Sequence, residues 1–274
     1  MRTFFSHKQS DMAIIRLRVP VGILYPEQLD VLKQVACRYG DERLHLTVRK
    51  TVEIPGIPVA KLSQAMEELA AAGLRTTTVG DTIRNVMACP GTYSCPNSII
   101  DTQSLGLEID SNVCFEGEIP SKMKIAIAGC ANGCTSPQVN DIGIVGINTV
   151  EVVEKNCEHC YTCVDFCREK AIYKADTGRI EIDRNKCVDC GLCADECEAL
   201  KSKQTGYRIS VGGKLGRHLV MGRNFGDYSM MYHVLDAMEK IVFIYKERGK
   251  PGERLGETID RIGFDEFKTL VDRL

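Results

Sequence analysis

The chain has 274 residues, of which 44% are hydrophobic, with a formal net charge of −2 and a sequence pI near 6.2. This size allows one large domain or a few small ones, and the balanced charge gives no indication of nucleic acid or an anionic membrane as a partner. No apolar run approaches the roughly 20 residues of a membrane span. Residues 1–11 lack the apolar stretch of a signal peptide, so we expect a cytoplasmic protein.

The first 80 residues predict an α/β unit with an antiparallel or mixed sheet and helices on one face. Alternating polarity indicates strands over residues 11–20 and 43–54, and helical spacing indicates helices over residues 26–38 and 58–72, with Gly73 as a stop. The side chains expected to face the core are Leu29, Leu32, Ala36 and Cys37 in the first helix, and Val59, Leu62, Met66 and Leu69 in the second.

The rest of the chain changes composition twice. Residues 81–150 are rich in Gly, Pro, Asn and Cys and contain one strong strand, 124–128, whereas residues 151–203 are dense in cysteine. In residues 204–274 we expect a strand at 207–211, a helix at about 229–245 and two short helices. The side chains of the longer helix expected to face inward are Met231, Val234, Leu235, Met238, Ile241 and Val242.

Eight of the 14 cysteines form an internal repeat, in which C-x2-C-x2-C-x3-C occurs twice. The first run is Cys157, Cys160, Cys163 and Cys167, and the second is Cys187, Cys190, Cys193 and Cys197. A reducing cytosol disfavours disulfides, so such a pattern indicates metal binding. This spacing is typical of two-cluster ferredoxins, in which the fourth cysteine of each run ligates the other cluster.

We therefore predict two 4Fe–4S clusters whose ligands cross the repeat, because three closely spaced thiolates wrap three corners of a cubane and leave the fourth corner open. The predicted sets are Cys157, Cys160, Cys163 and Cys197, and Cys187, Cys190, Cys193 and Cys167. Arg168 and Glu198 stand where the ferredoxin pattern has proline, which weakens the turn signal but not the ligand count. Zinc knuckles are the alternative, but their usual C-x2-C…C-x2-C spacing fits these runs poorly.

A second cysteine set consists of a C-x5-C pair, Cys89 and Cys95, and a C-x3-C pair, Cys130 and Cys134. With their flanking segments, 82–89 (TIRNVMAC) and 124–134 (KIAIAGCANGC), these pairs resemble the signature of sulfite and nitrite reductases that use sirohaem coupled to a 4Fe–4S cluster. The resemblance implies that the four thiolates hold a third 4Fe–4S cluster, and that the Cys134 sulfur bridges it to the sirohaem iron.

The resemblance covers nearly the whole chain. Residues 14–20 (IIRLRVP) and 46–50 (LTVRK) resemble substrate-side strands, and residues 120–124 (PSKMK) and 211–217 (VGGKLGR) resemble a paired-lysine segment and a glycine-rich segment near the cofactor. It implies an α+β fold with a ferredoxin-like half-domain (1–80), a sirohaem and 4Fe–4S domain (81–150 and 204–274) and an inserted two-cluster ferredoxin domain (151–203). Such inserts occur in dissimilatory-type sulfite reductases and in anaerobic sulfite reductase subunits.

The resemblance also implies two groups of site residues. Those expected to hold the substrate anion are Arg16, Arg18, Arg84, Lys122 and Lys124. Those expected to bind the cofactor are Arg49, Lys50, Asn132, Cys134, Gly212, Gly213, Lys214 and Arg217. Sirohaem carboxylates and sulfite both need fixed positive charge, although any one of these basic side chains has the alternative of a solvated strand face.

Strand alternation refines this expectation. Arg16 and Arg18 would share one face. Lys122 and Lys124 would share another, which continues through the small residues Ala126 and Ala128 and would let a flat macrocycle lie close. The side chains that would enter the core instead are Met123, Ile125 and Ile127. His45 is a weaker candidate for contact with substrate or cofactor, and Cys114 has no assigned role.

The leading functional hypothesis is six-electron reduction of sulfite to sulfide, with three 4Fe–4S clusters and sirohaem as cofactors. Nitrite reduction to ammonia and an iron–sulfur electron-transfer subunit are the alternatives. The chain contains no G-x-G-x-x-G after a strand, so a separate protein or subunit is expected to donate the electrons. Because the chain contains a single copy of the reductase unit, we expect a homodimer or a heteromer with a related subunit.

Overall fold

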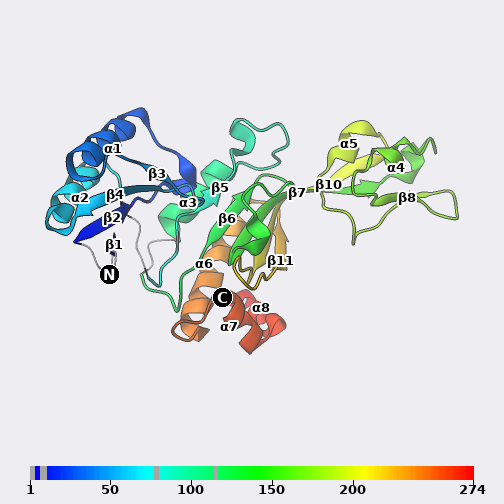
Figure 1. Cartoon of the computed structure of the whole chain (residues 1–274). Helices are drawn as coiled ribbons and strands as arrows, with labels where there is room; N and C mark the ends of the chain where they lie inside the picture. The colour runs from blue at the N-terminus through cyan, green and yellow to red at the C-terminus, as the bar shows by residue number, and fades with distance from the viewer. Residues whose placement is uncertain (1–3, 7–10, 77–79, 114–116) are drawn as a thin grey trace.

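The computed structural model describes residues 4–6, 11–76, 80–113 and 117–274. Cys114 lies outside the described residues. Figure 1 shows three units, which are the N-terminal unit, a central unit that includes the C-terminal helices, and a cysteine-rich unit at the far end of two long strands. None of the described helices is long and apolar enough to cross a membrane.

The N-terminal unit is a four-stranded antiparallel sheet in the order β1-β2-β4-β3, packed against two helices. Its strands are β1 (Phe4–Ser6), β2 (Met12–Arg16), β3 (His45–Leu46) and β4 (Val52–Pro58), and its helices are α1 (Pro26–Tyr39) and α2 (Leu62–Ala71). The antiparallel sheet with helices follows the expectation from the sequence. Fully buried apolar side chains from both layers, such as Ile15, Leu32 and Ile54, form its core.

Three details of that unit were predicted wrongly. Val59, expected to face the core from the second helix, is 45% exposed and lies in the short helix Val59–Lys61 that precedes α2. Residues 43–54 are not one strand, because the chain reverses between β3 and β4, where the Thr47 N–H donates to the Thr51 carbonyl at 2.9 Å. Lys50 takes a left-handed φ of 57° in this turn without a glycine to signal it. In α1, Cys37 is exposed and Leu29 is 49% exposed, because the buried stripe runs through Leu32, Val35 and Ala36.

The central unit is a five-stranded mixed sheet in the order β11-β10-β7-β6-β5. Its strands are β5 (Met87–Ala88), β6 (Ile125–Ala128), β7 (Ile142–Val152), β10 (Leu200–Val211) and β11 (Arg223–Tyr228). Its helices are α3 (Thr102–Asn112), α6 (Met231–Arg248), α7 (Leu255–Ile262) and α8 (Phe264–Asp272). The β5–β6 and β6–β7 pairs are parallel, and β10 pairs antiparallel with both β7 and β11.

The side chains in and next to β6 were predicted to alternate between the core and an open face. Met123, Ile125 and Ile127 are fully buried, as predicted. Ala126 and Ala128, expected on an open face for a flat ligand, are also buried, because β6 lies inside the sheet between β5 and β7. The predicted inner face of α6 is confirmed: its side chains are either buried or packed against the core.

The cysteine-rich unit is built on the far ends of β7 and β10, which pair continuously from Ile142–Val211 to Val152–Leu200 apart from one bulge. It adds α4 (Thr162–Phe166), α5 (Leu192–Glu196) and the hairpin of β8 (Ile172–Lys174) and β9 (Ile180–Ile182). Its buried core is small, consisting of Val150, Cys163, Ile172, Ile180 and Leu200. The two strands therefore join this unit directly to the central sheet.

Glu253, between α6 and α7, is held by several hydrogen bonds. Its carboxylate accepts hydrogen bonds from Arg261 at 2.8 Å, from the Thr258 hydroxyl at 3.0 Å and from the Lys250 N–H at 2.9 Å. The Arg261 contact lowers the pKa of Glu253 from 4.5 to about 2. A carboxyl group with a depressed folded-state pKa stabilises the fold above its unfolded pKa and loses that contribution as the pH falls through the folded value.

Glu253→Gln should therefore destabilise the protein by on the order of 1 kcal/mol at neutral pH, since solvent partly screens this pair. The difference from wild type should shrink between about pH 4.5 and pH 2. Urea unfolding across this range measures it. A constant difference at every pH would contradict the assignment.

Candidate functional site

Four thiols gather at one edge of the central sheet. Cys89 and Cys130 follow the parallel neighbours β5 and β6, so both lie where these strands end. Cys89 is buried, and its Sγ accepts the Gly129 N–H at 3.1 Å. Burial raises the pKa of Cys130, and the Cys95, Cys134 and Cys89 thiols raise it further. The two pairs, separate in sequence, thus lie within electrostatic reach of one another.

The cysteines of the repeat fall into two further groups. Burial raises the pKa of Cys163, and the neighbouring thiols that raise it further are Cys197, Cys157 and Cys160. Burial raises the pKa of Cys193 to about 11, and the neighbouring thiols that raise it further are Cys190, Cys187 and Cys167. Each group thus combines three cysteines of one run with the last cysteine of the other.

A cavity of about 320 Å³ lies beside the second group. All four of its thiols line this cavity, namely Cys167, Cys187, Cys190 and Cys193. The remaining lining is mostly apolar, with Val150, Phe166 and Ile172 among it, and it includes Ala131 and Asn132. Those two residues lie between Cys130 and Cys134, so the second group of the repeat and the loop of the central quartet border the same space.

The donor set fits iron–sulfur clusters better than single ions. Among the residues that the structure describes, no three His, Cys, Asp or Glu side chains converge as one metal ion requires. A cubane places its iron atoms at separate corners, each held by a different thiolate, so its ligands surround a volume and do not meet at a point. Four thiols around an apolar cavity match that requirement.

Arginines from three separate segments line a second cavity, of about 200 Å³. Arg16 ends β2, Arg49 lies in the turn between β3 and β4, and Arg84 lies on the segment that leads to β5. Thr47, Val48, Thr51 and Asn85 complete the lining. We call these three arginines and the nearby Lys124 the cationic cluster. A cavity with this lining suits a small oxyanion or a carboxylate, because guanidinium groups bind such oxygens in pairs.

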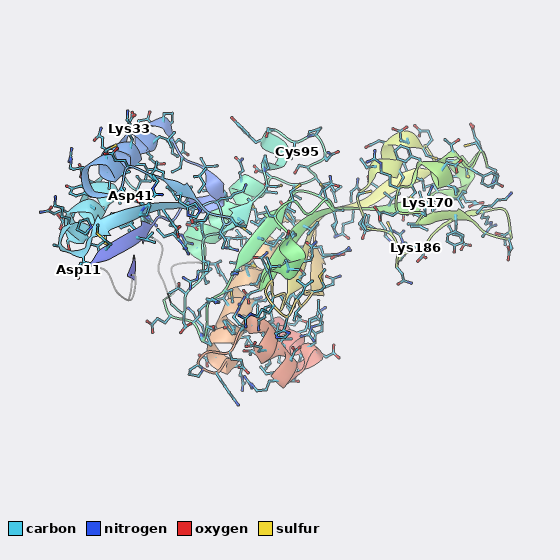
Figure 2. The ribbon with its side chains drawn as sticks, viewed as in Figure 1. Asp11, Lys33, Asp41, Cys95, Lys170 and Lys186 are labelled. Atoms are coloured by element: carbon cyan, nitrogen blue, oxygen red, sulfur yellow. The ribbon has the colours of Figure 1, made fainter. Side chains whose placement is uncertain are left out.

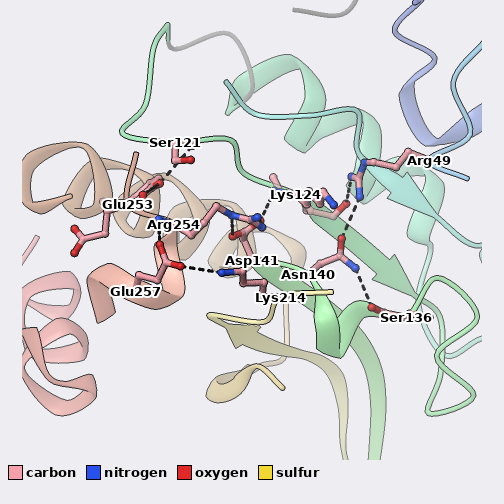
Figure 3. Close-up of polar contacts among 12 residues, drawn as sticks. Arg49, Ser121, Lys124, Ser136, Asn140, Asp141, Lys214, Glu253, Arg254 and Glu257 are labelled. Atoms are coloured by element: carbon pink, nitrogen blue, oxygen red, sulfur yellow. Dashed lines mark hydrogen bonds and ion pairs between the residues drawn. The ribbon is translucent and has the colours of Figure 1, made fainter. Parts of the chain in front are cut away.

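The cationic cluster is held by backbone and acidic partners. Arg49 donates to the Asn85 carbonyl at 2.6 Å and to the Asn140 Oδ1 at 3.1 Å (Figure 3), while its Nε is buried with no hydrogen-bond partner among the described residues. Arg84 donates to the Gly80 carbonyl at 2.8 Å. Arg16 is hydrogen-bonded through its Nε to Glu53 at 2.7 Å.

Burial and neighbouring positive charges lower the pKa values of two members of the cationic cluster, Arg49 and Lys124. Burial lowers the pKa of Arg49 to about 10, and nearby Arg84 and Arg254 lower it further against the opposing charge of Asp141. Burial also lowers the pKa of Lys124, followed by the charge of Arg49. Both side chains would gain from an added anion, because it would offset this repulsion.

Sequence reasoning missed the acid–base pair that supports this cluster. Arg254, at the start of α7, donates from Nε to Asp141 at 2.9 Å and from Nη2 at 2.5 Å, and the Lys124 N–H donates to the same carboxylate at 2.7 Å (Figure 3). Asp141 is 1% exposed. A polar Asn140–Asp141 pair directly before the apolar β7 was the available signal for Asp141, whereas no local pattern marked Arg254.

Some predicted residues lie apart from the cationic cluster. Arg18 is buried and its Nε donates to Asp110 at 2.9 Å, so its charge is already neutralised on the α3 side. Lys122 is exposed, next to the half-buried Lys124. His45 contacts Glu53 through Nδ1 at 2.7 Å. Arg16 and Arg18 thus meet different acidic partners, although the strand pattern placed them on one face.

The predicted cofactor-binding residues occupy three places. Lys50 donates to the Ala88 carbonyl at 2.6 Å, directly before Cys89. A Cβ at Gly213 would lie 2.4 Å from the Asn140 carbonyl oxygen, so this position needs glycine for close packing. Lys214 is paired with Glu257 at 2.9 Å, and Arg217 is exposed. Asn132 lies in the Cys130–Cys134 loop, where a hydrogen bond from its backbone partly offsets the burial that raises the pKa of Cys130.

Figure 2 shows how these parts are distributed along the molecule. Cys95 lies on a loop that projects from the central unit, while Lys170 and Lys186 mark the cysteine-rich unit and Lys33 and Asp41 mark the N-terminal unit. The thiol quartets thus occupy the central and cysteine-rich units, and the cationic cluster joins the N-terminal and central units.

The chain is similar in sequence to proteins that are named as sulfite reductases or their subunits. The chain is 35% identical over 95% of its length to a coenzyme F420-dependent sulfite reductase of Methanocaldococcus jannaschii, of which it covers 42%. It is 29% identical over 58% of its length to one of the anaerobic sulfite reductase subunits of Salmonella typhimurium, of which it covers 51%. The chain thus spans about half of these curated relatives or less.

A solved structure shows the same fold. The crystal structure of dissimilatory sulfite reductase I matches 95% of this chain with a TM-score of 0.75 at 21% identity, over 69% of that chain. The family described as nitrite/sulfite reductase ferredoxin-like half domain matches residues 6–72. The family described as nitrite and sulphite reductase 4Fe-4S domain matches residues 79–274. Since these matches cover most of the chain, it belongs to the nitrite and sulphite reductase family.

Proposed function

We propose that the protein reduces sulfite to sulfide in a sirohaem-dependent, six-electron reaction. One observation supports this most directly. The short segment 84–89 places Arg84 and Asn85 in the cavity of the cationic cluster and Cys89 in the central thiol quartet. The proposed anion site and the proposed cluster site would therefore be joined by a segment of six residues.

The residues present fit the cofactors that this family implies. The buried, unpaired Nε of Arg49 and the arginine-lined cavity suit carboxylate or sulfite oxygens. The thiol sets proposed as cluster ligands are Cys89, Cys95, Cys130 and Cys134, then Cys157, Cys160, Cys163 and Cys197, then Cys167, Cys187, Cys190 and Cys193. When bound, three 4Fe–4S clusters and sirohaem supply the electron transfer and the redox chemistry at sulfur.

The chain itself contributes positioning and charge. Arg16, Arg49 and Arg84 would hold anionic oxygens at the cavity, and solvent would screen the contact to the buried Arg49 least. Lys124 lies next to Arg49 and has a lowered pKa, so it would release a proton to a bound oxygen more readily than an exposed lysine. Asp141 and Arg254 would keep the Lys124 backbone in place through the 2.7 Å contact to its N–H.

Lys124→Ala should lower sulfite turnover roughly tenfold or more, because it removes a donor from the anion site. Lys122→Ala should have a smaller effect in the same direction, since Lys122 is exposed. Methyl-viologen-driven turnover measures both, and the visible spectrum should stay unchanged. Lys170→Ala on the cysteine-rich unit is the matched control and should turn over like wild type. Unchanged turnover in Lys122→Ala and Lys124→Ala would refute their role.

Nitrite reduction to ammonia is the second candidate, because the family itself includes nitrite reductases and nitrite would fit the same cavity. The four positive charges of the cationic cluster favour the more highly charged sulfite ion over nitrite. Turnover measured side by side with sulfite and nitrite distinguishes the two substrates. The higher kcat/KM identifies the preferred one.

The visible spectrum of the anaerobically purified protein tests the proposal as a whole. A chlorin-like red band and iron for three cubanes per chain support it. Iron–sulfur absorption without that band would favour an electron-transfer subunit and overturn the proposed reaction.

The proposal extends to assembly and location. The chain contains one N-terminal unit and one central thiol quartet, so we propose a homodimer or a heteromer with a related subunit, reduced by a separate donor protein in the cytoplasm. Light scattering that shows a fully active monomer would contradict the assembly.

A further inference from the structure

The two cysteine runs differ at the positions that face the central sheet. Asp189 in the second run stands where the first run has His159, and Gly191 stands where the first run has Tyr161. All four residues have left-handed φ angles between 50° and 74°, so the two loops share a backbone shape. The side chains at these two positions are therefore among the differences between the two loops.

Gly191 allows the second loop to lie directly against β7. A Cβ at this position would lie 2.3 Å from the Asn148 Nδ2. The Asn148 N–H donates to the Asp189 carbonyl at 2.7 Å, and Asn148 forms an isolated bridge with Cys190. A side chain such as that of Tyr161 would prevent this approach. The second loop is thus docked on the central sheet by its own backbone.

Arg208 of β10 adds an ion pair to the same junction. Its Nη2 lies 2.9 Å from an Asp189 carboxylate oxygen, and its Nε and Nη2 donate to Asp227 of β11 at 2.8 and 2.6 Å. The Asp189 side chain is 10% exposed, and the Cys187 Sγ lies 3.7 Å from its Oδ1. Arg208, which Asp227 holds in the central sheet, therefore pairs with the Asp189 carboxylate, and that carboxylate lies beside Cys187.

We propose that Arg208 is a positioning residue that clamps the second cysteine loop to the central sheet through Asp189, and thereby sets the reduction potential of the cluster held by Cys167, Cys187, Cys190 and Cys193. This inference rests on the proposed function only for the identity of that cluster. The clamp itself rests on the contacts of Arg208, Asp189 and Asn148. Because the same thiol set borders the Cys130–Cys134 loop, this cluster would be the inner of the two ferredoxin clusters.

The sign of the expected effect follows from charge. Reduction adds an electron to the cluster, so a nearby positive charge favours the reduced form and a negative charge disfavours it. Arg208→Gln removes the closer of two cations at Asp189, since Arg184 Nη1 lies 3.8 Å from the Asp189 Oδ1. The substitution should move the potential of one ferredoxin cluster to a more negative value. Asp189→Asn removes a negative charge and should move the same potential in the opposite direction. Arg208→Lys keeps the charge and should restore most of the wild-type potential.

The test is an EPR-monitored redox titration of the full-length holoprotein. One cluster should respond to both substitutions with opposite signs, while the other ferredoxin cluster stays at its wild-type potential. Arg179→Gln is the matched control, because Arg179 lies in the same unit but pairs with Glu154 at 3.5 Å on an exposed surface. Potentials that do not move in Arg208→Gln and Asp189→Asn would overturn the proposal.

Amide hydrogen exchange provides a readout that does not depend on the clusters. Arg208→Gln should speed exchange at the Asn148 amide, whose acceptor is the Asp189 carbonyl, and should leave the β8–β9 hairpin unaffected. Unchanged exchange at Asn148 would overturn the clamp whatever cofactors the protein contains. Iron analysis that finds no ferredoxin clusters would instead overturn the proposed function, and the exchange result would still decide the clamp.

Discussion

Replacing Arg254 with methionine should destabilise the protein by about 3–5 kcal/mol, because the substitution leaves a buried carboxylate without its cation. Asp141 is 1% exposed and receives both guanidinium contacts of Arg254. Burial already raises the pKa of Asp141 against the opposing hydrogen bonds from Arg254. Urea unfolding of the purified variant measures the loss as a lower midpoint at constant m-value.

Two further variants show whether the loss comes from the pair itself. Lys240→Gln removes a cation from the Lys240–Asp236 pair of α6, which is solvent-exposed, and should cost less than about 1 kcal/mol. The double variant Arg254→Met with Asp141→Leu should recover much of the stability, since two apolar side chains replace an unpaired charge. Equal losses in the single and double variants would show that Arg254 acts through packing alone.

The Arg254–Asp141 pair illustrates what the sequence could not reveal. The two residues are 113 positions apart, and no local pattern marks Arg254 as the partner of Asp141. Their pairing depends on how α7 returns to the start of β7, which no local periodicity encodes. Arg18 shows the converse: a basic strand residue with the right neighbours for an anion site is neutralised by Asp110, 92 positions away.

Local patterns predicted the elements that depend on local physics. Helical spacing located α1 and α6 to within a few residues, because one buried stripe dictates each helix. The eleven-residue strand β7 escaped notice, since its glycines and a cysteine-rich neighbourhood obscure its apolar run. The reversal between β3 and β4 was missed because Lys50 adopts a left-handed conformation that sequence assigns to glycine or asparagine.

The cysteine runs were the most informative part of the sequence because their spacing is a constraint of cluster geometry. Three thiols separated by two residues can reach one cubane only through a tight loop, which holds in any fold. The spacing implies that Cys167 groups with the second run and Cys197 with the first, and the electrostatic effects of these thiols on one another's pKa support this grouping. Ligation itself stays a prediction, and it has a direct test.

Cys167→Ala should remove the cluster of the second run and leave that of the first. Cys167 lines the cavity together with Cys187, Cys190 and Cys193, whereas no cysteine of residues 157–163 does so. The variant should lose about four iron atoms per chain. Its EPR spectrum should match that of Cys187→Ala, and the spectrum of Cys197→Ala should match that of Cys157→Ala.

Ligation within each run makes the opposite prediction, since Cys167→Ala would then match Cys157→Ala. The small core of the cysteine-rich unit sharpens this comparison. Few apolar side chains hold it together, so each cluster should contribute to its folding as bound metals do in other small domains. Cys187→Ala and Cys167→Ala should therefore loosen the same loop at Asn148, as measured by amide exchange. Loosening confined to residues 157–163 would show that Cys167 serves its own run.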